Sequence, residues 1–280
     1  MAVGASVVLV SLIILALCAP VFEDWIGSGV DAINLLDRFA SPSWSHPLGT
    51  DELGRDVFVR LLYGGRVSLF VGVTAALSAA AIGVVIGLLA GYFGGWTDKI
   101  LMRFTDGVIS LPLLPLLIVL AAVDPAKLGF SGGDETTMGL YRIVLIVALV
   151  GWTTVARLVR STTLSLKQRP FVLAAHAQGA GPLRIMAVHI LPNLSSPIIV
   201  ATTLSAGNVI LLESVLSFLG LGIQPPLPSW GNLLTNAQEL IWNAPSLAFY
   251  PGVLIFLSVI ALNFIGDGLQ DALDPRAVRE

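Results

Sequence analysis

The chain has little charge and almost no cysteine. Only 12% of its 280 residues are Asp, Glu, Lys or Arg, whereas about 25% is usual for a soluble globular domain. Hydrophobic residues make up 55%, and the mean hydropathy is +0.87. These values exclude an ordinary soluble domain. Cys18 is the only cysteine, which excludes an internal disulfide and a cysteine-rich metal site. We interpret Cys18 as a small apolar residue of a membrane helix.

Several enzyme motifs are also missing. The sequence has no GxxxxGK[ST] phosphate-binding loop, which excludes a self-contained ATPase. The three histidines, His46, His176 and His189, lie outside the segments that we predict to span the membrane, and no HExxH occurs. Both facts argue against an intramembrane hydrolase. We therefore expect a non-enzyme without catalytic residues, without a bound metal and without a nucleic-acid partner.

Long uncharged runs are what the sequence has instead. They cover residues 1–22, 67–97, 107–123, 185–212, 214–238 and 240–266, with a shorter run at 143–156. A bilayer crossing needs about 20 mainly apolar residues. Trimming the polar ends predicts six transmembrane helices, at about 3–21, 67–92, 107–123, 138–157, 196–219 and 247–267. An all-α membrane bundle follows, because lipid tolerates only a backbone whose hydrogen bonds are satisfied internally.

The Lys and Arg residues indicate the orientation of these helices. With the N-terminus inside, the cytoplasmic side holds Lys99, Arg103, Arg157, Arg160, Lys167, Arg169, Arg184, Arg276 and Arg279. The outer side holds Arg38, Arg55, Arg60, Arg66, Lys127 and Arg142. The bias is clearest between the fourth and fifth spans, in a short loop that carries many of the inner cations. The positive-inside rule places this loop and both termini in the cytoplasm.

The first span has a competing interpretation as a signal peptide. It lacks a basic start, and the residues before Cys18 lack the small residue that precedes a lipidated cysteine. We therefore expect a retained first helix.

Residues 169–193, RPFVLAAHAQGAGPLRIMAVHILPN, form a polar island that we predict to be two short helices. Pro170 suits the first turn of one helix, and Gly179-Ala180-Gly181 breaks it. Pro182 opens the next helix, and Pro192-Asn193 stops it. Ala174 and Ala175 leave a face with little bulk. An apolar stripe at helical spacing is formed by Leu183, Met186, Ala187 and Ile190. The pattern indicates a docking element that faces water, with an ordinary interfacial hairpin as the alternative.

The spacing of Ala174-Ala175, Gly179 and His189-Ile190-Leu191-Pro192 resembles the "EAA" loop of ABC-importer permeases. In that family the loop fits a groove on the ATPase subunit. Two residues depart from the motif: Leu173 replaces its acidic residue, and His189 replaces an apolar one. We therefore expect docking to rest on shape and apolar contact. The ATPase-coupling residues that the resemblance implies are Phe171, Ala174, Ala175, Gly179, Pro182, Leu183, Met186, His189, Leu191 and Pro192.

Other segments resemble the smaller permease of dipeptide, oligopeptide and nickel importers. They are HPLGTDELGRD at 46–56, the GYFGGW run at 91–106, LSFLGLGIQPPLPSWG at 216–231 and NFIGDGLQDALDPR at 263–276. The resemblance covers about residues 45–280 and implies a type I permease bundle, with an N-terminal helix and external loop in 1–65 and the permease domain in 66–280.

Partners follow from the same resemblance. It implies a second homologous permease, ABC ATPase subunits, an external binding protein and the inner membrane of a bacterium. Under this hypothesis the chain has no cofactor of its own, because ATP and Mg²⁺ bind the partner ATPase. Peptides are the expected substrate, with nickel or another small solute as the alternative. A proton-coupled secondary transporter is less favoured, because such proteins usually hold two related halves in one chain.

The 46–56 loop has two interpretations. Asp51, Glu52 and Asp56 are close enough to suggest a cation site, but EF-hand spacing is absent. We favour a structural turn in which Arg55 and Arg60 neutralise the acids, with Thr50 or Asp51 as the helix cap. We interpret His46 as a loop residue.

The fifth span carries a charge in its interior. Glu213 shares one helical stripe, about 120° wide, with Thr202, Ser205 and Ser217. An ionisable group in a membrane helix is costly unless it faces protein or water. The stripe is therefore either a wall of the translocation pathway or part of a helix-to-helix contact. We interpret Asn208 as an interhelical hydrogen-bonding residue.

Three further patterns concern packing. Gly83, Gly87 and Gly91 follow small-xxx-small spacing, which lets helices approach closely within the bundle or at a partner permease. Pro112 and Pro115 predict a kink in the third span. Residues 220–231, which contain three prolines and Trp230, predict an outer loop able to contact a binding protein.

Overall fold

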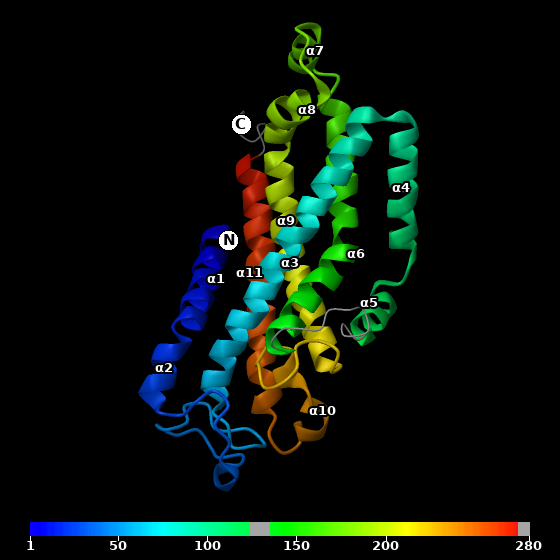
Figure 1. The fold of residues 1–280 in the computed structure, drawn as a ribbon. Coiled ribbons are helices and arrows are strands. Elements are labelled where there is room, and N and C mark those ends of the chain that lie inside the picture. Colours follow the sequence, from blue (N-terminus) through cyan, green and yellow to red (C-terminus); the bar gives the residue numbers. More distant parts are fainter. Residues whose placement is uncertain (124–134, 274–280) are drawn as a thin grey trace.

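The chain folds as a bundle of long helices that run mostly along one axis, as seen in a computed structural model that describes residues 1–123 and 135–273 (Figure 1). The α-helices are α1 Ala2–Leu17, α2 Ala19–Ile26, α3 Val57–Phe93, α4 Gly95–Ser110, α5 Leu113–Ala122, α6 Glu135–Leu166, α7 Pro170–Ala177, α8 Pro182–Arg184, α9 Leu191–Phe218, α10 Ala237–Leu240 and α11 Ser246–Leu273. Shorter turns are η1 Leu35–Asp37, η3 Ile185–Ile190 and η4 Asn232–Leu234. The predicted sides of Lys127, Arg276 and Arg279 concern positions outside the described residues.

The helices confirm the prediction of an all-α membrane bundle. Within residues 1–123 and 135–273, four helical segments are long and apolar enough to cross a bilayer, and the number rises to six if each of two bent helix pairs counts as one span. The pair α1–α2 bends by 53°, and the pair α4–α5 bends by 87°. Helix α3 runs without a break through residues 65 and 66, where the sequence suggested a division of the chain.

The third span begins earlier than predicted. Helix α4 starts at Gly95 and includes Asp98 and Asp106, which lie before the predicted start of the span near residue 107. The prediction missed this helix because it counted charges against a span. In the structure Asp98 pairs with Arg160, and Asp106 pairs with Arg157, both from α6. Paired charges are far less costly inside a bundle than isolated ones.

The predicted kink is confirmed. Helix α4 ends at Ser110 and α5 begins at Leu113, with extended backbone at Leu111 and Pro112. Proline lacks a backbone N–H and cannot continue an α-helix, so the break falls where Pro112 stands.

The second short helix of the polar island does not stop at Pro192. One helical segment runs from Pro182 to Phe218, with a π-helical turn at Ile185–Ile190. The Leu191 N–H donates to the Met186 carbonyl, five residues back. Such a widened turn accommodates a proline ring that would clash in a regular α-helix. The Pro192-Asn193 stop signal was therefore a wrong prediction.

The glycine stripe of α3 packs against α6 within the chain. A methyl group at Gly87 would lie 2.6 Å from the Ala156 carbonyl oxygen, and one at Gly83 would lie 2.7 Å from that of Trp152. At Gly91 a methyl group would lie 2.9 Å from the Arg160 carbonyl oxygen. This settles the choice that the sequence left open, because the three glycines face α6.

The 46–56 loop forms the structural turn network. Asp51 accepts hydrogen bonds from the Leu53 and Arg55 backbone N–H groups at 2.9 and 3.0 Å, and its other oxygen lies 2.7 Å from Arg55 Nε. The predicted capping residues were wrong. Asp56 caps α3, because its Oδ1 accepts from the Val59 N–H at 2.9 Å while His46 Nδ1 lies 3.0 Å from its Oδ2.

Candidate functional site

The α7–α8 hairpin, residues 170–184, projects beyond the long helices at one end of the bundle (Figure 1). Helix α7 begins at Pro170, as predicted, and ends before Gly179, whose φ of +82° lies in the left-handed region that glycine adopts readily. The Gly179-Ala180-Gly181 break is therefore confirmed.

The hairpin is anchored by an inward apolar face. Val172 and Ala175 are buried, and so are Ile185, Met186 and Ile190 of the turn that follows α8. They pack against α3 and α6 residues such as Leu88, Val155 and Val159. The structure therefore places two predicted contact residues, Ala175 and Met186, inside the chain rather than on a free surface. The π-helical turn shifts the apolar face, because it adds a residue to that turn.

The outward face of the hairpin combines large apolar side chains with small residues. Phe171 is 42% exposed, Leu173 58% and Leu183 78%. Ala174, Gly179 and Pro182 are exposed between them, Pro192 is exposed at the start of α9, and His189 and Leu191 are half-buried. Leu173, the residue that replaces the acid of the motif, is thus available for apolar contact.

Glu213 lies in the interior of the bundle and not on a water-filled wall. Its side chain is fully buried. Ser68 of α3 donates to Glu213 Oε2 at 3.0 Å, and Ser217 donates to Oε1 at 2.7 Å. Of the two interpretations weighed from the sequence, this arrangement supports the helix-to-helix contact.

The same two serines attach the outer loop to the bundle. Ser68 Oγ accepts from the Trp230 backbone N–H at 3.1 Å, and Ser217 Oγ accepts from that of Ile223 at 3.0 Å. Trp230 is 2% exposed, and its indole N–H donates to the Leu61 carbonyl at 3.0 Å. The loop therefore presents Gln224 and Pro225 outward, while Trp230, expected within a contact loop, is an internal anchor.

A cavity of about 440 Å³ opens between the α4–α5 pair and helices α3, α6 and α9. Most of its lining is apolar, and its polar lining comes from Thr153, Thr154, Arg157, Ser205 and Asn208. Ser205 is the one member of the predicted stripe that lines the cavity. Thr202 does not line it, and its hydroxyl donates to the Ile198 carbonyl of the same helix at 2.7 Å.

Asn208 lies in a different environment from the one that the sequence predicted. It was expected between helices, but it is exposed and lines the cavity. On α9, Ser205, Asn208 and Leu212 are spaced at i, i+3 and i+7 and share one face. An uncharged amide in the middle of an apolar helix is a weaker sequence signal of a polar environment than the carboxylate of Glu213.

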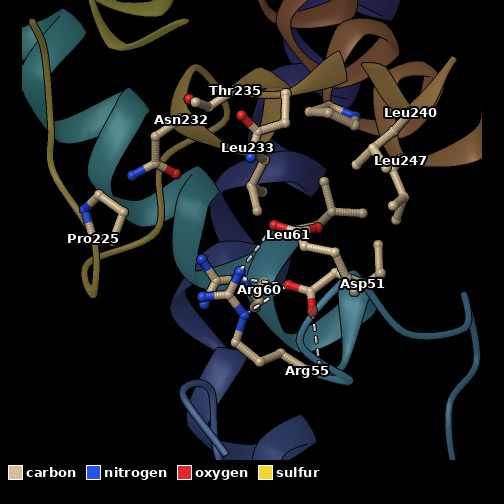
Figure 2. Close-up of a pocket in the computed structure, with 14 residues that line it drawn as sticks. Asp51, Arg55, Arg60, Leu61, Pro225, Asn232, Leu233, Thr235, Leu240 and Leu247 are labelled. Carbon is tan, nitrogen blue, oxygen red and sulfur yellow. Dashed lines mark hydrogen bonds and ion pairs between the residues drawn. The ribbon is translucent and has the colours of Figure 1, made fainter. Parts of the chain in front are cut away.

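A second, smaller pocket lies at the opposite end of the bundle from the hairpin. Figure 2 shows Asp51 between Arg55 and Arg60, beneath Leu233 and Asn232 of the outer loop. Its volume is about 110 Å³, which is room for a few water molecules. Asp51 Oδ2 lies 3.8 Å from Arg60 Nε, and Asp31 Oδ1 lies 3.2 Å from Arg60 Nη1. Among residues 1–123 and 135–273, no group of three or more His, Cys, Asp or Glu residues is placed to hold a metal ion.

Curated relatives match almost the whole chain. The dipeptide transport system permease protein DppC of Alkalihalophilus pseudofirmus is 40% identical over 276 residues, which cover 99% of this chain and 86% of the relative. The oligopeptide permease OppC of Bacillus subtilis is 38% identical over 276 residues, with the same coverage. The glutathione permease GsiD of Escherichia coli is 42% identical over 279 residues, covering 99% of this chain and 86% of the relative.

A solved structure supports the same fold. An inward-facing form of the MetNI methionine ABC transporter aligns with a TM-score of 0.60 at 19% identity, covering 78% of this chain and 96% of that chain. The family model described as "Binding-protein-dependent transport system inner membrane component" matches residues 83–279. Because this model covers most of the chain and the relatives match almost all of it, the chain belongs to this family of ABC-importer permeases.

Proposed function

We propose that this permease imports peptides, that its α7–α8 hairpin couples it to a separate ATPase, and that the cavity beside α9 is part of the substrate route. The observation that supports coupling best is the outward face of the hairpin, where Phe171, Leu173 and Leu183 are exposed on a firmly anchored base. A helix whose buried face packs against α3 and α6 moves with the bundle as a rigid element, so a displacement of the hairpin is passed on to these helices.

The proposal places ATP and Mg²⁺ on the partner ATPase. This chain contributes the hairpin and one wall of the substrate route, and that wall moves during transport. A second homologous permease completes the route, and an external binding protein delivers the substrate. The hairpin end then faces the cytoplasm, and the end with the outer loop faces outward. These partners follow from family membership and from the apolar face of the hairpin.

The lining of the cavity suits a peptide. Asn208, Ser205 and Thr154 provide neutral hydrogen-bonding groups, which can exchange bonds with peptide amides without binding them tightly. An exposed amide at membrane depth is costly against lipid, so Asn208 is expected to face protein or water. Glu213 is covered by protein, so the alternative of a proton-driven transporter has no support from this carboxylate. The names of the relatives, which include dipeptide, oligopeptide and glutathione permeases, favour peptides over nickel.

Docking is tested with Ala174→Trp, because Ala174 is exposed whereas Ala175 is buried. The added indole should obstruct an ATPase groove and leave the fold intact. The matched control is Ser45→Trp, at an exposed position in the opposite end loop. We expect Ala174→Trp to reduce copurification of the ATPase and peptide uptake at least tenfold, on the order of 1.4 kcal/mol or more. Normal copurification and uptake would rule out docking at the hairpin.

The route and the substrate are tested together in proteoliposomes. Asn208→Leu removes the amide at similar size and should lower peptide uptake about tenfold while leaving ATPase binding unchanged. Val215→Ala, on an exposed part of α9 outside the cavity, serves as the control.

Competition of uptake by di- and oligopeptides but not by nickel supports the proposed substrate. Nickel uptake without peptide competition would contradict it.

A further inference from the structure

The acids of helix α4 pair with arginines of α6, whereas its bases do not. Its acids, Asp98 and Asp106, turn toward α6, where Arg160 Nη2 lies 2.6 Å from Asp98 Oδ2 and Arg157 Nη2 lies 2.6 Å from Asp106 Oδ1. Its bases, Lys99 and Arg103, are exposed, and Asp106 borders their side of the helix, three residues after Arg103 and seven after Lys99. None of the ion pairs found in residues 1–123 and 135–273 uses either base.

The face that carries the bases is also apolar. Trp96 is 78% exposed, and Ile100 and Phe104 are each 62% exposed. These three residues repeat every four positions, and Lys99 and Arg103 repeat beside them with the same spacing, so all five lie on one side of the helix. Lys99 Nζ lies 5.6 Å from the centre of the Trp96 ring. We call this surface the outer α4 face (Trp96, Lys99, Ile100, Arg103 and Phe104).

The outer α4 face lies at the hairpin end of the bundle. Helix α4 starts at the end of the bundle at which α3 finishes, which is also the end that carries the α7–α8 hairpin (Figure 1). Lys167, near the end of α6, donates to the Gly91 carbonyl at 3.1 Å and so ties the two helix ends together. Tyr92, Phe93 and Trp96 cluster at this turn, as aromatic residues do at a membrane interface.

We propose that the outer α4 face binds an anionic phospholipid of the inner leaflet, with the phosphate held by Lys99 and Arg103 and the acyl chains lying on Ile100 and Phe104. Charge complementarity identifies the occupant, because Lys99 and Arg103 take part in none of the ion pairs of the described residues, whereas the bordering acid, Asp106, is neutralised by Arg157. Long basic side chains can also reach from within the hydrocarbon edge to the phosphate level. Ile100 and Phe104 each directly follow one of the cations, so basic and apolar side chains alternate along this face.

The test uses the intact transporter, freed of native lipid and titrated with phosphatidylglycerol or phosphatidylcholine under native mass spectrometry. We expect the wild type to retain phosphatidylglycerol preferentially. The double variant Lys99→Gln/Arg103→Gln should lose about tenfold or more in phosphatidylglycerol affinity and little in phosphatidylcholine affinity. The charge-conserving variant Lys99→Arg/Arg103→Lys should keep the preference, which shows that the loss is due to charge.

Arg66→Gln is the matched control. Arg66 is an exposed cation that forms no ion pair among the described residues, and it lies 5.6 Å from the Tyr63 ring centre. Unlike Lys99 and Arg103 it has no second cation beside it on its helix, and it lies near the start of α3, toward the other end of the bundle. This variant should not change lipid retention. Unchanged affinity in the double variant, or an equal loss in Arg66→Gln, overturns the proposal.

A photo-crosslinking side chain at Ile100 identifies the occupant directly. A crosslink to phospholipid supports the proposal, whereas a crosslink to the second permease or to the ATPase overturns it. Neither measurement depends on which solute is transported. The lipid proposal can therefore fail while the proposal of peptide import stands, and the reverse is also possible.

Discussion

At the scale of single residues, Glu213 shows how a buried carboxylate can hold a loop against a membrane bundle. Two serine hydroxyls donate to it, and each accepts a backbone N–H from the outer loop. Each hydroxyl therefore uses its single proton toward Glu213 and its lone pairs toward the loop. The carboxylate fixes the orientation of both hydroxyls and, through them, the position of residues 223–230.

We expect Glu213→Ala to lower the thermal stability of the purified protein by about 1–3 kcal/mol, because Ser68 and Ser217 lose their acceptor and a cavity remains. Glu213→Gln should cost less, since it keeps the size and one acceptor oxygen. Limited proteolysis should cleave the outer loop faster in the alanine variant. A normal melting temperature combined with lost uptake would instead indicate that Glu213 contacts substrate.

At the scale of helices, the α3–α6 contact relies on the absence of side chains. Lipid provides no hydrophobic drive between helices, so close approach and dispersion hold them together. Glycines at 83, 87 and 91 allow the α6 backbone to lie directly on α3. A single methyl group in this contact has no room, whereas one on an open helix face has ample room.

Gly87→Ala tests this packing. A methyl group there would lie 2.6 Å from the Ala156 carbonyl oxygen and 2.7 Å from Val159 Cβ. Overpacking should cost about 1–3 kcal/mol, which exceeds the gain of about 1 kcal/mol from replacing glycine within a helix. The control is Gly107→Ala in α4, where nothing lies within 4 Å, and it should be neutral or stabilising. Equal melting temperatures for the two variants would contradict the close packing.

The attachment of α4 to α6 depends on ion pairs of different quality. Asp98 and Arg160 form a two-bond pair with side chains 18% and 32% exposed, while Asp106 and Arg157 are 52% and 50% exposed. Double-mutant cycles on thermal stability should give a coupling of about 1 kcal/mol or more for the first pair. For the second pair we expect less than about 0.5 kcal/mol, because water screens it. The reverse order would show that α4 is held mainly by its other contacts.

At the scale of the whole molecule, the two ends of the bundle differ in structure. The α7–α8 hairpin lies at one end, and the 27–56 loop lies at the other together with the 220–245 segment (Figure 1). Transport with a direction requires such an asymmetry, because a binding protein and an ATPase must act on opposite faces.

Cysteine labelling in whole cells tests the orientation. In a Cys18→Ala background the chain has no other cysteine. Ser45→Cys and Gln178→Cys lie at exposed positions of the two ends. We expect a membrane-impermeant maleimide to label Ser45→Cys in intact cells and Gln178→Cys only after permeabilisation. The opposite pattern would place the hairpin outside the cell and end the coupling proposal.

The fold was predictable from the sequence to the extent that its signals are local. Pro112 breaks a helix and Gly179 permits a left-handed turn wherever they stand, so both predictions were confirmed. Pro192 was misjudged because its effect depends on whether the preceding turn can widen. Asp98 was placed outside a span because its partner, Arg160, is 62 residues away, beyond the reach of any pattern.

By itself, the sequence determined that the chain is a helical membrane protein, because apolar runs, prolines and glycines act within a few residues of their own position. Its resemblance to importer permeases rests on separate motifs, such as the loop at 169–193 and the segment at 46–56. Only the tertiary structure decided which way each polar side chain faces. It turned Glu213 and Trp230 inward and Asn208 toward a cavity, and it left Lys99 and Arg103 exposed. These directions depend on neighbours from other helices, and packing alone brings those neighbours together.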